Sequence, residues 1–370
     1  MNILEELQQL PDPRMAGKVK HKLGTVCFVA LCAVLSGCES WGDIEEYCEI
    51  KREWLSQYVD LSNGIPSEWT FRRVFTLLHP DYMAEFLQRH AAHLVRNEET
   101  DSDQIAIDGK ALRGSKRQDL QCLQSVSAWC HEHSLVLGEC QVDGKSNEIT
   151  AIPLLLNSLD IYQKTITIDA MGCQKSICEL IRAKKGHYVV GLKSNHKYLY
   201  QAAVDLKNRE GEHNTNRLHD AFDDSHGRSV RRRYFGYDAR KLPGIDAWAG
   251  ARSIIAVETI SNKTNDPNSK LTTCWRYYLS SHKHTDSKLP NYIRNHWSIE
   301  NRLHWMLDVH LKEDDDQKAE RKSARSFALL RRISLNIIRL KGETAKKRSL
   351  RRRRKRAGWS NEYLLSLLVD

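Results

Sequence analysis

The N-terminal part of the chain carries apolar side chains at the spacing of amphipathic helices. The first helix shows this spacing at i, i+4 and i+7, with Ile3, Leu7 and Leu10. An apolar run at 23–38 and the segment 41–58 continue the pattern, and Pro66 precedes another helix start. We therefore predict an all-α N-terminal domain over residues 1–95. It is either a helix-turn-helix-like DNA-binding module or a domain that only packs on its neighbour.

The pattern then changes to short runs of β-type residues separated by helical segments. Strands are predicted at 104–108, 123–129, 135–142, 165–169 and 187–192, and helices at 149–159 and 176–185. Three strands that can pair as a meander, followed by helix, strand, helix and strand, have the order of an RNase H-like fold. The fold class expected is α/β: an RNase H-like mixed sheet flanked by helices, in a catalytic domain over residues 100–342.

Between residues 198 and 287 the alternation of helices and strands lapses, which predicts a mostly β insertion. Its strands are expected at 230–237, 252–259 and 274–279. Two long helices follow, at 291–311 and 324–340, and residues 343–370 form a basic C-terminal tail.

The net charge of +10 comes mostly from this tail. The run 346–356 holds nine basic residues and no acidic one, so the remainder of the chain carries only +1. Because the run contains no aromatic residue, we expect it to supply non-specific DNA affinity through phosphates. Aromatic and apolar residues beyond it are expected to anchor its far end: Trp359, Tyr363, Leu364, Leu365 and Leu367. The alternatives are a solvated tail or, in a eukaryote, an import signal.

The ten cysteines lack the spacing of zinc sites or disulfide frameworks, which favours a reducing cytoplasm. One segment suggests export instead, because lysines precede the apolar run 23–38 and its end at Cys38 resembles a lipoprotein cleavage site. The segment before the run is long and contains acids, and the run is too short to span a bilayer. We therefore predict a cytoplasmic protein with no membrane association.

Three acidic residues stand where a metal-dependent nuclease needs them. Asp108 ends the first predicted strand, Asp169 ends the fourth, and Glu300 lies on the helix 291–311. The first and fourth strands are neighbours in an RNase H-like sheet, so the carboxylates would meet. A lone strand-end aspartate is often only a turn residue. Oxygen ligands favour Mg²⁺, with Mn²⁺ as a substitute, and paired ions clamp the attacking and leaving oxygens of a phosphodiester.

Further candidates lie near these acids. His304 shares a helix face with Glu300, four residues away, and would meet the metal site or a phosphate unless it is core packing. Arg294, on a flanking face, suits a phosphate contact. The acidic run 313–316 is interpreted as solvated, with Glu313 as a possible exception.

Two arginines of the predicted insertion form a basic row. Arg231 and Arg233 point to the same side of an extended strand and are expected to lie against DNA. The alternative is an edge strand that uses charge to avoid aggregation. The set of expected DNA contacts also includes Lys110, Arg113 and Lys193.

Three segments resemble a known family: Ile-Asp-Gly-Lys-Ala-Leu-Arg-Gly-Ser at 107–115, Thr-Ile-Asp-Ala-Met at 167–171, and His-Trp-Ser-Ile-Glu-Asn at 296–301. The chain is similar to the H-repeat-associated transposases of bacterial Rhs elements, a group of DDE insertion-sequence transposases. The resemblance implies an RNase H-like core, a catalytic triad of Asp108, Asp169 and Glu300, an N-terminal associated domain and a β insertion. Related groups carry a Tyr-Arg-Glu-Lys signature, from which this chain departs: His296 stands where arginine is usual, and Leu307 where lysine is.

These observations predict a DNA transposase that acts as a homodimer on DNA. It would cut the ends of its element and join the 3′ ends to target DNA. Two alternatives remain: a metal-dependent nuclease without strand transfer, and a domesticated or inactive DNA-binding protein of the same fold.

Overall fold

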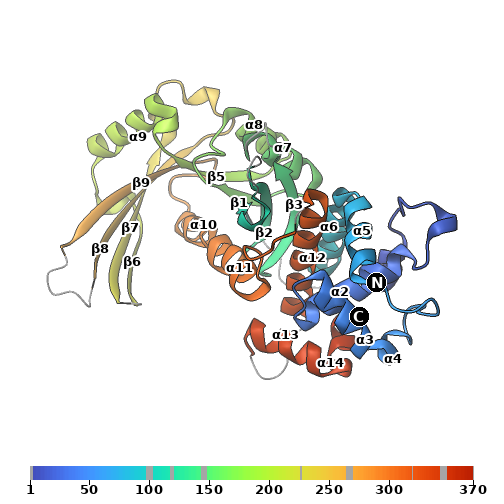
Figure 1. Ribbon diagram of the computed structural model, residues 1–370. Coiled ribbons are helices and arrows are strands. Elements are labelled where there is room, and N and C mark those ends of the chain that lie inside the picture. The colour runs from blue at the N-terminus through green and yellow to red at the C-terminus, as the bar shows by residue number, and fades with distance from the viewer. Residues whose placement is uncertain are drawn as a thin grey trace. The chain divides into compact units, whose positions relative to one another are not determined.

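The computed structural model describes residues 3–96, 103–116, 121–142, 148–225, 227–263, 270–318, 320–341 and 348–369 (Figure 1). The predicted N-terminal helical region is confirmed. Its helices are α1 (Ile3–Gln8), α2 (Leu23–Ser36), α3 (Trp41–Ile50), α4 (Arg52–Leu55), α5 (Glu68–Leu77) and α6 (Pro80–Arg96).

Helix α2 is the apolar run that raised the question of export. All its residues from Leu23 to Leu35 are buried, and it ends at Gly37, whose φ of 114° is left-handed and favours glycine. In the described residues, no single helix has both the length and the apolar character needed to cross a membrane. The pair α2 and α3, bent by 94°, passes that test by length and composition only.

The strands form one mixed sheet in the order β3-β2-β1-β4-β5-β9-β8-β7-β6. The first five are β1 (Gln104–Leu112), β2 (Leu123–Cys130), β3 (Leu135–Val142), β4 (Thr165–Ile168) and β5 (His187–Leu192). Strand β1 pairs in parallel with β4, and β4 with β5, whereas β2 and β3 are antiparallel. Helices α7 (Glu148–Ser158) and α8 (Lys175–Ala183) follow β3 and β4 in the chain. The predicted α/β class with an RNase H-like strand order is confirmed.

The insertion extends this sheet with four antiparallel strands. They are β6 (Arg217–Ser225), β7 (Arg228–Asp238), β8 (Ser253–Lys263) and β9 (Thr272–Ser280), and helix α9 (Lys197–Glu210) precedes them (Figure 1). Strand β6 was not predicted. It is polar, with the sequence Arg-Leu-His-Asp-Ala-Phe-Asp-Asp-Ser, because it is the edge strand and has no buried face to impose apolar alternation.

The prediction of one continuous helix at 291–311 is wrong. The segment consists of α10 (Leu289–His296), a π-helical segment η7 (Ile299–His304) and α11 (Trp305–Leu311). Periodicity alone does not reveal a π turn, because one wider turn displaces the apolar stripe by only a single residue.

The C-terminal region, predicted as a basic tail, contains two helices. After α12 (Arg321–Leu340) come α13 (Leu350–Trp359) and α14 (Asn361–Leu368). Tyr363, Leu364 and Leu367 are buried, as expected of an anchor. Trp359 is 77% exposed, so its predicted anchoring role is wrong.

By its internal contacts the chain forms two compact units. One comprises Met1–Asp101, Gly109–Lys145 and Glu300–Asp370, and the other Ser102–Asp108 and Ser146–Ile299. In the first unit α12 packs on α2, α5, α6 and β3. In the second, α10 packs on β4 and β5 over a core that includes Val189, Tyr234 and Ile293.

Candidate metal centre and DNA-contacting side chains

Asp108 and Asp169 come to the same end of two neighbouring strands. The register of β1 and β4 places Ile107 opposite Ile168, so each aspartate directly follows a paired residue. Neighbouring strands lie about 4.8 Å apart, and residues opposite each other in a parallel pair point to the same face. Both carboxyl groups are half-buried. The sequence predicted this adjacency from element order alone.

The carboxylate of Asp169 is oriented by the turn that follows β4. Its Oδ1 accepts hydrogen bonds from the backbone N–H groups of Met171, at 2.9 Å, and Gly172, at 3.3 Å. Within the described residues its Oδ2 makes no hydrogen bond. The turn therefore fixes one carboxylate oxygen and leaves the other able to bind a cation. An aspartate bound to its own turn is common, and here it fixes the direction of the carboxylate.

Glu148, at the start of α7, is a neighbour of Asp169 that the sequence did not single out. Burial raises the pKa of the Glu148 carboxyl, and the negative charge of Asp169 raises it further. Two carboxylates that repel each other form a site that a cation would stabilise. The sequence signals were a glutamate at a helix start, which usually reflects the helix dipole, and the similarity of the segment 145–149 to the same transposase family.

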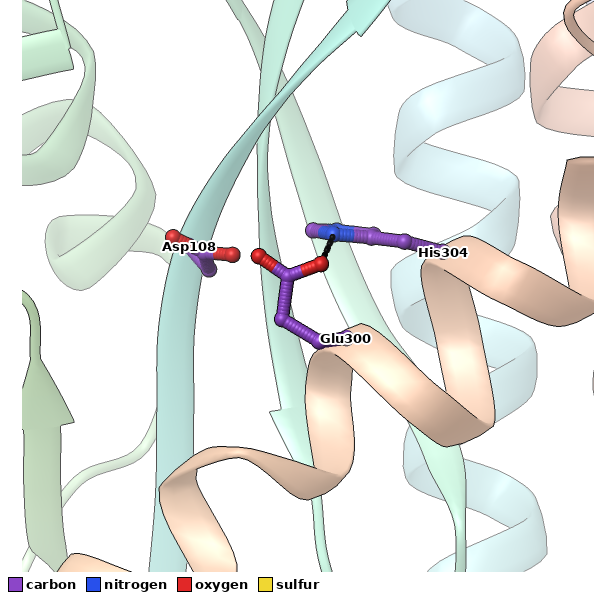
Figure 2. A group of neighbouring side chains, drawn as sticks. All are labelled: Asp108, Glu300 and His304. Atoms are coloured by element: carbon purple, nitrogen blue, oxygen red, sulfur yellow. Dashed lines mark ion pairs between the residues drawn. The ribbon is translucent and has the colours of Figure 1, made fainter. Parts of the chain in front are cut away.

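Glu300 and His304 lie on the π-helical segment η7. The Nδ1 atom of buried His304 is 3.5 Å from Oε2 of exposed Glu300. Figure 2 shows the Glu300 carboxylate with one oxygen toward His304 and the other toward Asp108. Ligand atoms of Asp108, Glu300 and His304 all lie within 4.8 Å of one another. Asp169 is not part of this group.

The donor chemistry of this group fits a divalent cation. Carboxylate oxygens suit Mg²⁺ and Mn²⁺, and an imidazole nitrogen favours Mn²⁺ over Mg²⁺. His304 was expected to meet either the metal site or a phosphate; it lies in one group with Asp108 and Glu300, and both roles stay predictions. π turns are frequent at functional sites because they reorient side chains that an α-helix would space differently.

Lys110 was expected to contact DNA, but its ammonium group forms ion pairs with acidic side chains of this chain. It is 9% exposed, and its Nζ lies 2.6 Å from Asp308 Oδ1 and 3.4 Å from Asp314 Oδ1. Burial raises the pKa of the Asp308 carboxyl, against the effect of Lys110. Because Lys110 follows Asp108 on β1 and Asp308 is on α11, this ion pair joins β1 to the helix after Glu300. The geometry therefore favours a structural role for Lys110.

The acidic run 313–316 is only partly solvated: Glu313 is buried, as the exception allowed for, and the burial of the Asp316 side chain is contrary to expectation. Glu313 is fully buried and accepts a 2.6 Å hydrogen bond from Nη1 of Arg332 on α12. Asp316 pairs with buried Arg331 at 2.6 Å. Acids in a row can alternate between core and solvent when a neighbouring helix supplies buried cations, which the run itself does not show.

Two other predicted contacts are exposed. Arg113 has an 81% exposed side chain, 3.7 Å from Asp314. Lys193 is exposed directly after β5, the strand beside β4, and so at the same strand end as Asp169. Their proposed contacts with DNA stay predictions.

In the insertion, Arg231 and Arg233 point to one face of β7, as predicted, but acids on that face pair with both. Arg231 makes two hydrogen bonds to Asp220, at 2.9 and 2.7 Å. Arg233 forms ion pairs with Glu258 and Glu212. Their role in DNA contact stays a prediction. The alternative of an edge strand is wrong, because β7 pairs with β6 on one side and with β8 on the other.

Three further arginines lie on the opposite face of these strands and on the neighbouring helix α10. Arg232 on β7, Arg276 on β9 and Arg294 on α10 form no ion pair with the described residues. Burial lowers the pKa of the Arg232 guanidinium, and the positive charges of Arg294 and Arg276 lower it further. Arg294 and Arg276 are therefore close enough to Arg232 to repel it, while the negative charge of Asp223 on β6 acts in the opposite direction. A group of neighbouring cations suits a polyanion. We call this set the insertion arginines.

Comparisons with known proteins identify the family of this chain. Residues 99–337 match the family described as the transposase DDE domain, and residues 4–91 match the family described as DDE_Tnp_1-associated. The chain belongs to the DDE transposase family. The predicted resemblance is thereby confirmed.

Relatives and solved structures extend the comparison. YbfL of Escherichia coli K12 is 37% identical over 380 residues, which cover 99% of this chain and 97% of that protein. From the same strain, the "H repeat-associated putative transposase YhhI" is 36% identical, with 99% and 97% covered. The "Inactive transposase YbfQ" is 44% identical over 72 residues, 20% of this chain and 86% of that protein. A structure of the piggyBac transposase synaptic complex with hairpin DNA aligns over 99% of this chain and 77% of that chain, with a TM-score of 0.40 and 11% identity.

Proposed function

We propose that this DDE-family protein is a DNA transposase that cuts DNA at the ends of its element and joins the 3′ ends to target DNA. The observation that carries the proposal is the placement of Asp108 and Asp169 at the in-register ends of β1 and β4. Glu300, with its ligand atom in the same group as that of Asp108, supplies the third carboxylate. Family membership supports the same assignment of roles.

In this proposal Asp108, Asp169 and Glu300 hold divalent cations. Bound Mg²⁺ or Mn²⁺ would lower the pKa of the attacking hydroxyl group and neutralise charge on the phosphate. The turn after β4 keeps one oxygen of Asp169 directed, and His304 restrains Glu300 through their ion pair. Glu148 adds negative charge beside Asp169, which would strengthen cation binding.

The proposal is tested with purified protein and a duplex carrying the inverted repeats that flank its coding region. We expect nicking at the repeat ends and joined products with target DNA, both dependent on Mg²⁺ or Mn²⁺ and lost with EDTA. Cutting without joined products would indicate a nuclease. Specific binding with no cutting in either metal would indicate an inactive DNA-binding protein.

The insertion arginines supply a second expected result, on DNA affinity. Replacing Arg232, Arg276 and Arg294 by glutamine should flatten the slope of log affinity against log salt by about 2.7, since each phosphate contact contributes about 0.9. Fluorescence anisotropy across a salt series measures this slope.

The matched control is the pair Arg231→Gln and Arg233→Gln on the opposite face of β7. Because acids already neutralise both arginines, their loss should change the slope by less than about one contact. If the control pair flattens the slope and the insertion arginines do not, DNA lies on the other face of the strand.

A further inference from the structure

Helix α13 separates the basic residues of the C-terminal run into an inward and an outward group. Arg353 Nη1 donates to the carbonyl oxygens of Ile338 and Arg339, at 3.1 and 3.2 Å, and so caps the end of α12. Arg354 is 7% exposed and donates to the carbonyl oxygen of Val34 at 3.2 Å. These two arginines stabilise the fold and are not available to a ligand.

The outward group forms a continuous surface along α13. Arg351, Arg352 and Lys355 are exposed, and Arg348 is half-buried. The spacing of four residues from Arg351 to Lys355 places that pair about 5–6 Å apart on the helix surface, and Arg348 lies just before the helix begins. With Trp359 these four cations define what we call the α13 basic face.

A hollow of about 730 Å³ lies on this face. It is lined by Arg348, Ser349, Arg351, Arg352, Lys355, Arg356 and Trp359. In the part of the chain that the structure describes, no acidic residue lines it. A hollow bounded by cations and one aromatic ring suits an anion that also has a flat apolar part.

Trp359 gives the face its specificity for a class of ligand. Its side chain is 77% exposed at the end of the cation rows, and Lys355 Nζ lies 6.0 Å from the ring centroid. Aromatic rings beside cations are the usual platform on which single-stranded nucleic acids stack their bases. In a duplex the bases are already stacked on one another, so an exposed indole finds no base face.

We propose that the α13 basic face binds single-stranded DNA, with phosphates on Arg351, Arg352 and Lys355 and a base stacked on Trp359. This inference goes beyond the proposed function, since it requires neither strand cleavage nor a divalent cation. Duplex DNA would meet the cations of this face but not the stacking platform.

The test measures binding of the full chain to a poly-dT oligonucleotide and to a duplex, both in EDTA. Replacing Trp359 by leucine should weaken oligonucleotide binding about tenfold and leave duplex binding within about twofold. Trp359→Phe, which keeps an aromatic ring, should retain most of the affinity. Equal loss on both DNAs, or no loss on the oligonucleotide, overturns the stacking role.

The cations are tested by replacing Arg351, Arg352 and Lys355 with glutamine. For the oligonucleotide the salt slope should flatten by about 2, because each contact with a single strand contributes about 0.7. A control with the same loss of charge replaces three exposed residues elsewhere, Arg52, Lys283 and Lys322. If the control flattens the slope equally, the effect is one of net charge and the α13 basic face is not a site. Because no metal is present, failure of this proposal is distinguishable from failure to cleave.

Discussion

Replacing Asp108 by asparagine, Asp169 by asparagine or Glu300 by glutamine is expected to abolish DNA cleavage while DNA binding survives. Each change removes one negative charge and one cation ligand at nearly constant volume. Mutation of a residue that only supports a metal ligand lowers activity or metal affinity by about 10–100-fold. Loss of a ligand itself should therefore lower the cleavage rate by more than about 100-fold. DNA affinity should stay near normal because it depends mainly on phosphate contacts.

Two readouts separate this result from misfolding. The end-cleavage rate is measured in Mg²⁺ and Mn²⁺, and thermal unfolding is measured with and without Mn²⁺, which should stabilise the native chain and not the three variants. Asp315→Asn is the matched control: it removes the same charge from a 71% exposed side chain near α11. Near-normal cutting by any one of the three variants would remove that residue from the candidate site.

Replacing Arg332 by methionine should lower the free energy of unfolding by about 3–5 kcal/mol, the usual cost of breaking a buried ion pair. Arg332 is fully buried and donates to Glu313 at 2.6 Å. Its charge also acts on buried Glu139. Burial raises the pKa of the Glu139 carboxyl, and Arg332 is the largest influence that opposes this rise. Without the guanidinium, and among the described residues, buried Glu313 keeps only Lys110, at 3.9 Å, and buried Glu139 keeps only the weaker effect of Arg325.

Urea denaturation followed by circular dichroism measures this loss. Lys322→Met, an exposed cation on the same helix, should change the free energy of unfolding by less than about 0.5 kcal/mol. Adding Glu313→Leu to Arg332→Met should recover part of the loss, because it removes one of these two acids. A cost near that of the Lys322 control would mean that water or a neighbouring group replaces Arg332.

The sequence by itself determined the strand order and the positions of the acids in it. Strands such as β3 and β5 are found at the predicted residues because their apolar runs are short, bounded and buried. Asp108 and Asp169 were predicted to meet because a parallel pair brings the ends of both strands to one edge, a rule that needs no side-chain detail. Glu300 and His304 were predicted to be neighbours for a local reason, because residues four apart on a helical segment share one face.

Only the tertiary structure decided which charged residues have partners. Strand periodicity says that Arg231 and Arg233 share a face, but not that Asp220 and Glu258 occupy it, since those acids come from neighbouring strands. Glu313 and Arg332 are buried together although both are charged, and Trp359 is exposed although it is a large aromatic residue. Pairing and burial depend on contacts between residues distant in sequence, whereas periodicity reports only how a segment faces its own surroundings.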